Sequence, residues 1–280
     1  MTATTGMTGT VHVVLIDTLA DLDTSAIPRT QSDNIRHQAE RTTQHIDSHA
    51  SWIGATTEQM TTALRDGWPE GAALVARLAD GMRGTLPKPK SFKRKQQWTA
   101  DGDEPSWERE SAGYEDIWRT SKREQQYGPA PIEVMAPWGA LGSVNADQLK
   151  WDGIVLVALT DLLEEAGYRV GATLNSAARA MNGHNYHLTS ITVKRPEMPL
   201  DISSMVAVAA HPGIFRWHGL SSRTLAPFDC GWGFGSTLEI AQLPSQVVPS
   251  NVIVLRHAYT EQAARYEVER ALALVIPVAA

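Results

Sequence analysis

From Ile132 to the C-terminus, short β-branched runs alternate with longer helical patterns of apolar residues. The β-like runs predict strands at 132–136, 168–174, 187–194 and 252–255. Apolar residues three and four positions apart predict helices at 146–166, 201–209 and 260–272. This alternation predicts an α/β fold in which a mostly parallel sheet carries helices on both faces.

Polar residues and glycines mark the ends of the predicted helices. Asn145 is placed to cap the helix at 146–166, and Gly167 follows that helix as its C′ residue. Asp201 and Thr260 take the N-cap positions of the two later helices. The strands at 168–174 and 187–194 are close enough in sequence to form an antiparallel hairpin.

The N-terminal half has a weaker pattern. A strand is predicted at 11–16, and the polar residues that follow it favour a mobile surface segment. Helical spacing over 57–64 and 74–82 predicts a helical hairpin, because a Gly-Trp-Pro-Glu-Gly stretch separates the two helices. We therefore divide the chain into a strand with a polar segment (1–50), a helical hairpin (51–84), a linker with one helix (85–130) and an α/β domain (131–280).

Composition and charge narrow the class of protein. The chain has 280 residues, a formal net charge of -6 and a single cysteine, Cys230. An acidic balance disfavours nucleic-acid binding by the whole surface, and one cysteine excludes an intrachain disulfide. The longest apolar runs are shorter than the roughly 20 residues that cross a bilayer, and no signal peptide is evident. These features predict a cytoplasmic protein that does not bind membranes.

The order of strand, long helix and antiparallel hairpin resembles the opening of von Willebrand A domains, which are Rossmannoid α/β folds. The resemblance covers roughly residues 130 to 275 and implies that the preceding residues form an N-terminal helical extension. Von Willebrand A domains carry Asp-x-Ser-x-Ser after the first strand, where it binds a divalent cation. This chain has Ala-Pro-Trp-Gly-Ala-Leu-Gly-Ser over 136–143, without a carboxylate. We therefore expect neither a metal site nor another cofactor.

A second resemblance rests on several short motifs in a fixed order. They are Trp52-Ile-Gly54, Gly67-Trp-Pro-Glu-Gly71, Asp101-Gly-Asp-Glu104, Trp118, Trp151-Asp-Gly153, Glu165-Ala-Gly-Tyr-Arg-Val170, Val193-Lys194, Leu200-Asp201 and His211-Pro212. Together they are similar to an uncharacterised family, a domain of unknown function, encoded mainly by tailed bacteriophages, prophages and their hosts. The resemblance implies a phage or mobile-element setting and carries no activity.

Several residue groups have the composition of a reactive site but lack its full pattern. His45 and His49 have the spacing of a helical zinc pair without a third ligand. Cys230 and His257 would form a nucleophile and base only if the fold brought them together, and His211 lacks an evident partner for acid–base work. The carboxylates of Asp101, Asp103 and Glu104 do not continue into a calcium-binding loop, and they could instead pair with the preceding basic run. An unrecognised hydrolase therefore stays open as one alternative.

A basic run lies within residues 88–98. Lys93, Arg94 and Lys95 are flanked by Phe92 and Trp98, and cations beside aromatic rings are typical of single-stranded nucleic-acid binding. The same composition is found in solvated linkers. Nucleic-acid association through this run is thus an alternative function.

The chain contains nine tryptophans, and three of them fall in predicted loops or at the ends of elements. These three are Trp138, Trp217 and Trp232. Aromatic side chains at such positions often anchor protein interfaces, although they also fill cores. The sequence therefore favours a non-enzymatic module that binds an unidentified protein partner.

Overall fold

The computed structural model describes residues 2–6, 9–17, 47–83, 96–102, 104–121, 131–180, 184–223, 236–243, 247–248 and 252–275. The chain divides into two compact units. The larger unit consists of Met1–Pro87 and Pro131–Ala280, and the smaller unit is Lys88–Ala130. The N-terminal strand and the helical hairpin, which the sequence pattern separated from the α/β domain, therefore share its unit.

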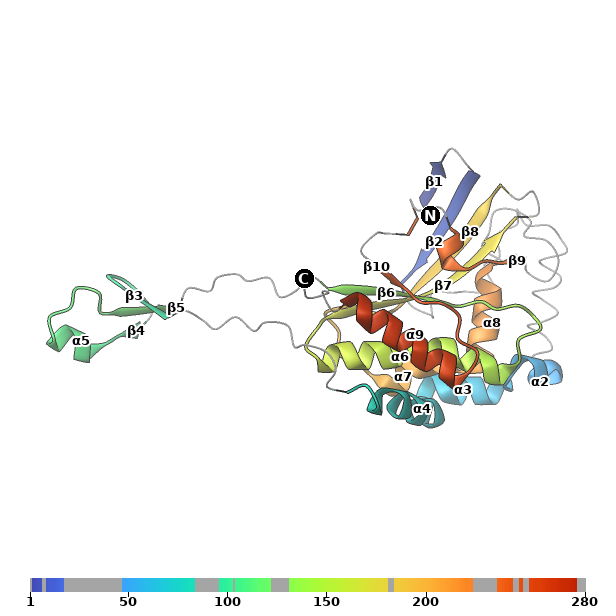
Figure 1. Ribbon diagram of the computed structural model, residues 1–280, viewed down its shortest axis with the longest axis horizontal. Helices are drawn as coiled ribbons and strands as arrows, with labels where there is room; N and C mark the ends of the chain where they lie inside the picture. Colours follow the sequence, from blue (N-terminus) through green and yellow to red (C-terminus); the bar gives the residue numbers. More distant parts are fainter. Residues whose placement is uncertain are drawn as a thin grey trace. The chain divides into compact units, whose positions relative to one another are not determined.

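The larger unit contains a seven-stranded sheet (Figure 1). Six of its strands run in the order β1 (Thr2–Gly6), β2 (Gly9–Ile16), β8 (Tyr186–Lys194), β7 (Val170–Arg179), β6 (Ile132–Pro137) and β10 (Val252–Val254). The seventh strand, β9 (Ser236–Thr237), pairs with β7 outside this order. The pairs β2–β8, β6–β7 and β6–β10 are parallel, whereas the β7–β8 hairpin is antiparallel. The predicted α/β class with a mostly parallel central sheet and the predicted hairpin are confirmed.

Helix α6 (Ala146–Glu165) lies against this sheet. Asn145 caps this helix through two reciprocal hydrogen bonds. Its side-chain oxygen accepts from Gln148 N, and the side-chain oxygen of Gln148 accepts from Asn145 N. Gly167 follows the helix with φ 97°, a conformation that favours glycine. Both helix ends thus agree with the sequence prediction.

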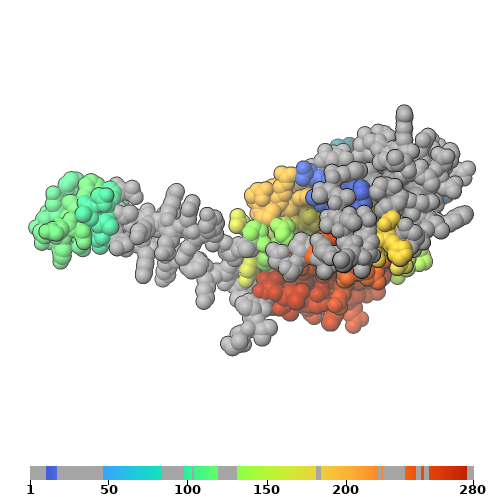
Figure 2. All heavy atoms as spheres, turned by 90° about the horizontal axis from the view of Figure 1, so that it is seen from above, coloured from blue at the N-terminus to red at the C-terminus, as the bar shows by residue number. Residues whose placement is uncertain are grey.

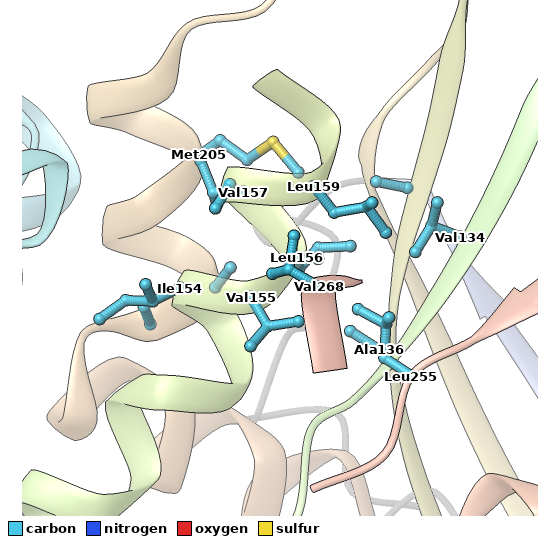
Figure 3. Packing of buried hydrophobic residues seen from close by; sticks show 14 of the residues in the cluster. Val134, Ala136, Ile154, Val155, Leu156, Val157, Leu159, Met205, Leu255 and Val268 are labelled. Carbon is cyan, nitrogen blue, oxygen red and sulfur yellow. The ribbon is translucent and has the colours of Figure 1, made fainter. Parts of the chain in front are cut away.

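Further helices pack against α6. They are α4 (Pro69–Asp80), α7 (Ile202–Ala210) and α9 (Glu261–Val275), and all three contact α6. Helix α6 is therefore enclosed by the sheet and these three helices, which explains why Ile154, Leu156 and Leu159 are all fully buried (Figure 3). Helix α9 reaches the outer surface of the unit (Figure 2, red).

The remaining helices of the larger unit contact these helices or one another. Helix α3 (Thr57–Asp66) ends before Gly67 and Trp68, which separate it from α4, and it contacts α7. The short α2 (Ala50–Ile53) contacts α8 (Pro212–Arg223). Pro212 is the first residue of α8, where its missing N–H costs nothing. The side chain of Asp201 caps α7, and Thr260 Oγ1 accepts a hydrogen bond from Ala263 N at the start of α9.

The opposite face of the sheet carries a smaller apolar cluster. Side chains alternate between the two faces of a strand, so that Val134 and Ala136 face α6 while Met135 faces away. Met135, Ala177 and Leu188 pack with Ile240 and Leu243. Ile240 belongs to the 3-10 helix η4 (Ile240–Gln242), which follows β9 (Ser236–Thr237), a strand paired with the end of β7.

The smaller unit contains its own sheet. Strands β3 (Gln96–Thr99), β5 (Trp118–Ser121) and β4 (Glu104–Pro105) pair antiparallel in that order, and α5 (Trp107–Ser111) follows β4. In the sequence, Tyr114, Ile117 and Trp118 have the spacing of one helical face, which predicts that the helix of this region includes them. In the structure the helix ends before Tyr114, and Trp118 begins a strand.

None of the described helices is long and apolar enough to span a membrane.

Candidate functional site

The smaller unit exposes large aromatic side chains. Trp98 on β3 is 39% exposed, Trp107 at the start of α5 is 69% exposed, and Tyr114 after α5 is 56% exposed. Aromatic rings of this size are normally buried when a chain folds, because each removes a large apolar area from water. Their joint exposure on so small a unit marks a candidate interaction surface.

Arg109 holds two of these rings in place. Its guanidinium carbon lies 4.7 Å from the centre of the Trp98 ring and 4.2 Å from the centre of the Tyr114 ring. Arg109 Nε also donates a hydrogen bond to the backbone oxygen of Asp116 at 3.0 Å. Stacked and hydrogen-bonded in this way, Arg109 links β3 to the residues that follow α5.

Local sequence signals produce this arrangement. The Ser106 side chain caps α5 by accepting a hydrogen bond from Arg109 N. Gly113, with φ 77°, turns the chain after the helix, and Tyr114 N then donates to Arg109 O at 3.1 Å. The cap and the glycine turn therefore bring Tyr114 back over Arg109.

Exposed carboxylates are close neighbours of Trp107 and Tyr114 in the sequence. Glu108 and Glu110 lie on α5 beside Arg109, and Glu115 and Asp116 directly follow Tyr114; all four residues are exposed. We call Trp98, Trp107, Tyr114 and these four acidic residues the aromatic–acidic surface. It combines apolar rings with negative charge, which suits a partner that is both apolar and cationic.

Trp138 and Trp217, two of the tryptophans predicted to anchor an interface, belong to the larger unit. Trp138 is fully buried and stacks on His218, with ring centres 6.5 Å apart. The alternation of β6 continues into Trp138 and turns its ring toward the helices, so no part of it is available to a partner. Trp217 is partly buried and packs on the small cluster that contains Met60 and Ile214.

The other predicted contact residues cannot be located. Trp232, Lys93, Arg94 and Lys95 lie outside the residues that the structure describes. The same holds for His45, Asp103 and Cys230. The aromatic–acidic surface is thus built from residues other than those that the sequence singled out, apart from Trp98 at the flank of the basic run.

A buried, hydrogen-bonded Asp–His pair lies at the carboxyl ends of β6 and β10, an edge where ligands often bind in α/β proteins. Asp152 of α6 is buried and accepts hydrogen bonds from His257 Nδ1 and Ala258 N, both at 2.6 Å. Tyr259 stacks on the His257 ring, and Glu239 Oε1 lies 4.0 Å from His257 Nε2. The pair fixes the chain after β10 against α6.

Burial dominates the electrostatics of this pair. Removal from water raises the pKa of the Asp152 carboxyl, and the hydrogen bonds from His257 and Ala258 oppose that rise. Burial, with a smaller contribution from the Asp152 and Glu239 charges, also raises the pKa of Tyr259. Asp152 was not predicted as a functional residue. The sequence did contain a signal for Asp152: a carboxylate within the most apolar helix is buried, and a buried carboxylate requires a hydrogen-bonding or charged partner.

His211, for which the sequence offered no evident partner, lies in the interior of the larger unit. His211 is buried with its ring edge against Trp68 at 5.2 Å, and burial lowers its pKa. Within the described ranges, no three His, Cys, Asp or Glu side chains lie close enough together to hold a metal ion.

A groove of about 520 Å³ lies between the end of β8 and α7. Its walls are largely apolar and include Val193, Met198 and Leu200. Two cations line it, and both are paired. Lys194 Nζ donates to Val170 O at 3.0 Å and forms an ion pair with Glu164, and Arg195 lies 3.4 Å from Asp17 Oδ1. The groove therefore offers a ligand apolar contact, and both of its cations already have partners within the chain.

The chain belongs to the family described as Domain of unknown function (DUF7192), whose model matches residues 15–275. The match includes β8, α6 and the aromatic–acidic surface, so both units belong to one family. Neither the curated proteins nor the solved structures contain a significant match.

Proposed function

We propose that this chain is a non-enzymatic protein-interaction module of a bacteriophage or mobile element. In this proposal it acts in the cytoplasm, of the host if it is phage-encoded, and binds a protein partner through the aromatic–acidic surface. The observation that carries the proposal is the joint exposure of Trp98, Trp107 and Tyr114 on one small unit. The phage setting is supported by the motif resemblance alone.

The energetics of association favour this surface as an anchor. Tryptophan, tyrosine and arginine are the residues most often found at the centre of protein interfaces, where truncation of one costs about 2 kcal/mol or more. Arg109 already holds the rings of Trp98 and Tyr114. A partner would therefore lose little side-chain entropy on binding them.

The nucleic-acid alternative has less support. Exposed rings could stack on bases, and Lys93, Arg94 and Lys95 precede β3 in the sequence. However, four exposed carboxylates adjoin Trp107 and Tyr114 in the sequence: Glu108, Glu110, Glu115 and Asp116. Their charge would repel the phosphates of a bound strand.

Site-specific photo-crosslinking would test the proposal. The full chain would carry p-benzoylphenylalanine at Trp107, or at Tyr266 as a control, because Tyr266 is 65% exposed on α9 of the larger unit. After irradiation in a lysate of the host cell, we expect a discrete protein adduct from position 107 that position 266 does not give. Equal adducts at both positions, or adducts to nucleic acid alone, would contradict it.

A further inference from the structure

We infer that the partner presents a segment rich in arginine and lysine to the aromatic–acidic surface. This inference rests on the proposed function and specifies the chemistry of its ligand. The aromatic side chains provide apolar contact area. The neighbouring carboxylates favour a partner with positive charge.

The charges select a cationic partner. Glu108 and Glu110 lie on either side of Arg109 in α5, and Glu115 and Asp116 follow Tyr114 at once. All four are exposed, whereas the one described cation between them, Arg109, is stacked on Trp98 and Tyr114. The negative potential of these four carboxylates would speed the association of a cationic segment and would orient it as it binds.

The aromatic rings suit the same ligand. A guanidinium or ammonium group over an aromatic face is attracted by the negative charge of that face, most strongly over tryptophan. The stacking of Arg109 on Trp98 and Tyr114 is an example within the unit itself. Trp107, at 69% exposed, has most of its ring open to a partner's side chain.

A fluorescence-anisotropy titration would test this inference. The full chain would be titrated into a labelled Arg/Lys-rich peptide, a peptide of equal length with glutamate at the basic positions, and a labelled single-stranded oligonucleotide. We expect the basic peptide to bind with an affinity that falls as salt rises, and the acidic peptide and the oligonucleotide not to bind.

Two variants with matched chemistry locate the site. The first carries Glu108→Gln, Glu110→Gln and Glu115→Gln, and the control carries the same change at Glu58, Glu197 and Glu269, which are exposed on the larger unit. We expect the first variant to bind the basic peptide about tenfold more weakly and the control to bind it as the wild type does. Trp107→Ala should weaken binding about threefold or more.

Each outcome supports or overturns the inference. Loss of binding in the first variant alone supports it, provided that both variants melt as the wild type does. Failure to bind the basic peptide, equal loss in both variants, or preference for the oligonucleotide would overturn it. If position 107 still gives a protein adduct in the crosslinking experiment, only the ligand chemistry is wrong, whereas absence of that adduct rejects the proposed function itself.

Discussion

His257 donates a hydrogen bond from Nδ1 to Asp152 Oδ2 over 2.6 Å, although 105 residues separate the two in sequence. The second oxygen of the same carboxylate accepts from Ala258 N. One buried side chain therefore ties the segment after β10 to helix α6. Because the carboxylate is buried, each of these bonds replaces one that water made in the unfolded chain.

Asp152→Ala should lower the free energy of unfolding by about 3–5 kcal/mol, because it leaves His257 and the Ala258 N–H buried without their acceptor. Denaturant unfolding followed by circular dichroism would measure the change. Asp147→Ala is the control on the same helix: the Asp147 side chain is 91% exposed beside Lys150, and its loss should cost under about 1 kcal/mol. Equal losses would show that Asp152 does not anchor the loop.

Gly153→Ala should destabilise the chain, although alanine favours helices more than glycine does. An added Cβ at Gly153 would lie 2.1 Å from Ala209 O, so that α6 and α7 would have to separate. We expect a loss of about 2 kcal/mol or more in thermal or denaturant unfolding. Gly142→Ala, with nothing within 4 Å of the added atom, should leave stability within about 0.5 kcal/mol. A Gly153→Ala variant as stable as the wild type would mean that the two helices are not in such close contact.

The sequence predicted the centre of the fold well, because the relevant signals are local. Asn145, Gly167 and the apolar run from Ile154 define α6 within its own residues, and the β7–β8 hairpin joins neighbours in the chain. The parallel pairing of β2 with β8 could not be predicted in the same way. It joins His12 to His187, and nothing within either strand encodes so distant a register.

The candidate surface was harder to predict for a different reason. Strands β3, β4 and β5 span only four, two and four residues, too few for a period of two to stand out from a linker. The stacking of Arg109 on Trp98 and Tyr114 depends on that small sheet. Conversely, Trp138 lies just after a strand and looked like a loop residue, but it continues the inward side of β6.

Stability should fall as the pH is lowered from about 6.5 toward 4. Burial lowers the pKa of His218, stacked on Trp138, from 6.5 to about 4. Because the folded-state value lies below the unfolded one, the neutral ring's contribution is full above pH 6.5 and is lost as the pH falls toward 4. That difference corresponds to at most about 3 kcal/mol.

The variant His218→Gln should flatten this pH dependence in denaturant unfolding between pH 7 and pH 4. His12 and His211, whose pKa values are also lowered by burial, should keep part of the slope. If the variant and the wild type lose stability in parallel, protonation of His218 does not contribute.

The basic run separates the protein-binding proposal from the nucleic-acid alternative. If a protein is the partner, the triple variant Lys93→Gln, Arg94→Gln and Lys95→Gln should match the wild type in stability to within about 1 kcal/mol for each charge. Neither form should then bind single-stranded DNA or RNA. If these three side chains contact phosphates, the wild type should bind single-stranded DNA or RNA with an affinity that falls steeply as the salt concentration rises, because each neutralised phosphate releases counterions. Anisotropy titrations at several salt concentrations would decide the matter, and salt-dependent binding that disappears in the triple variant would favour nucleic acid over protein as the ligand.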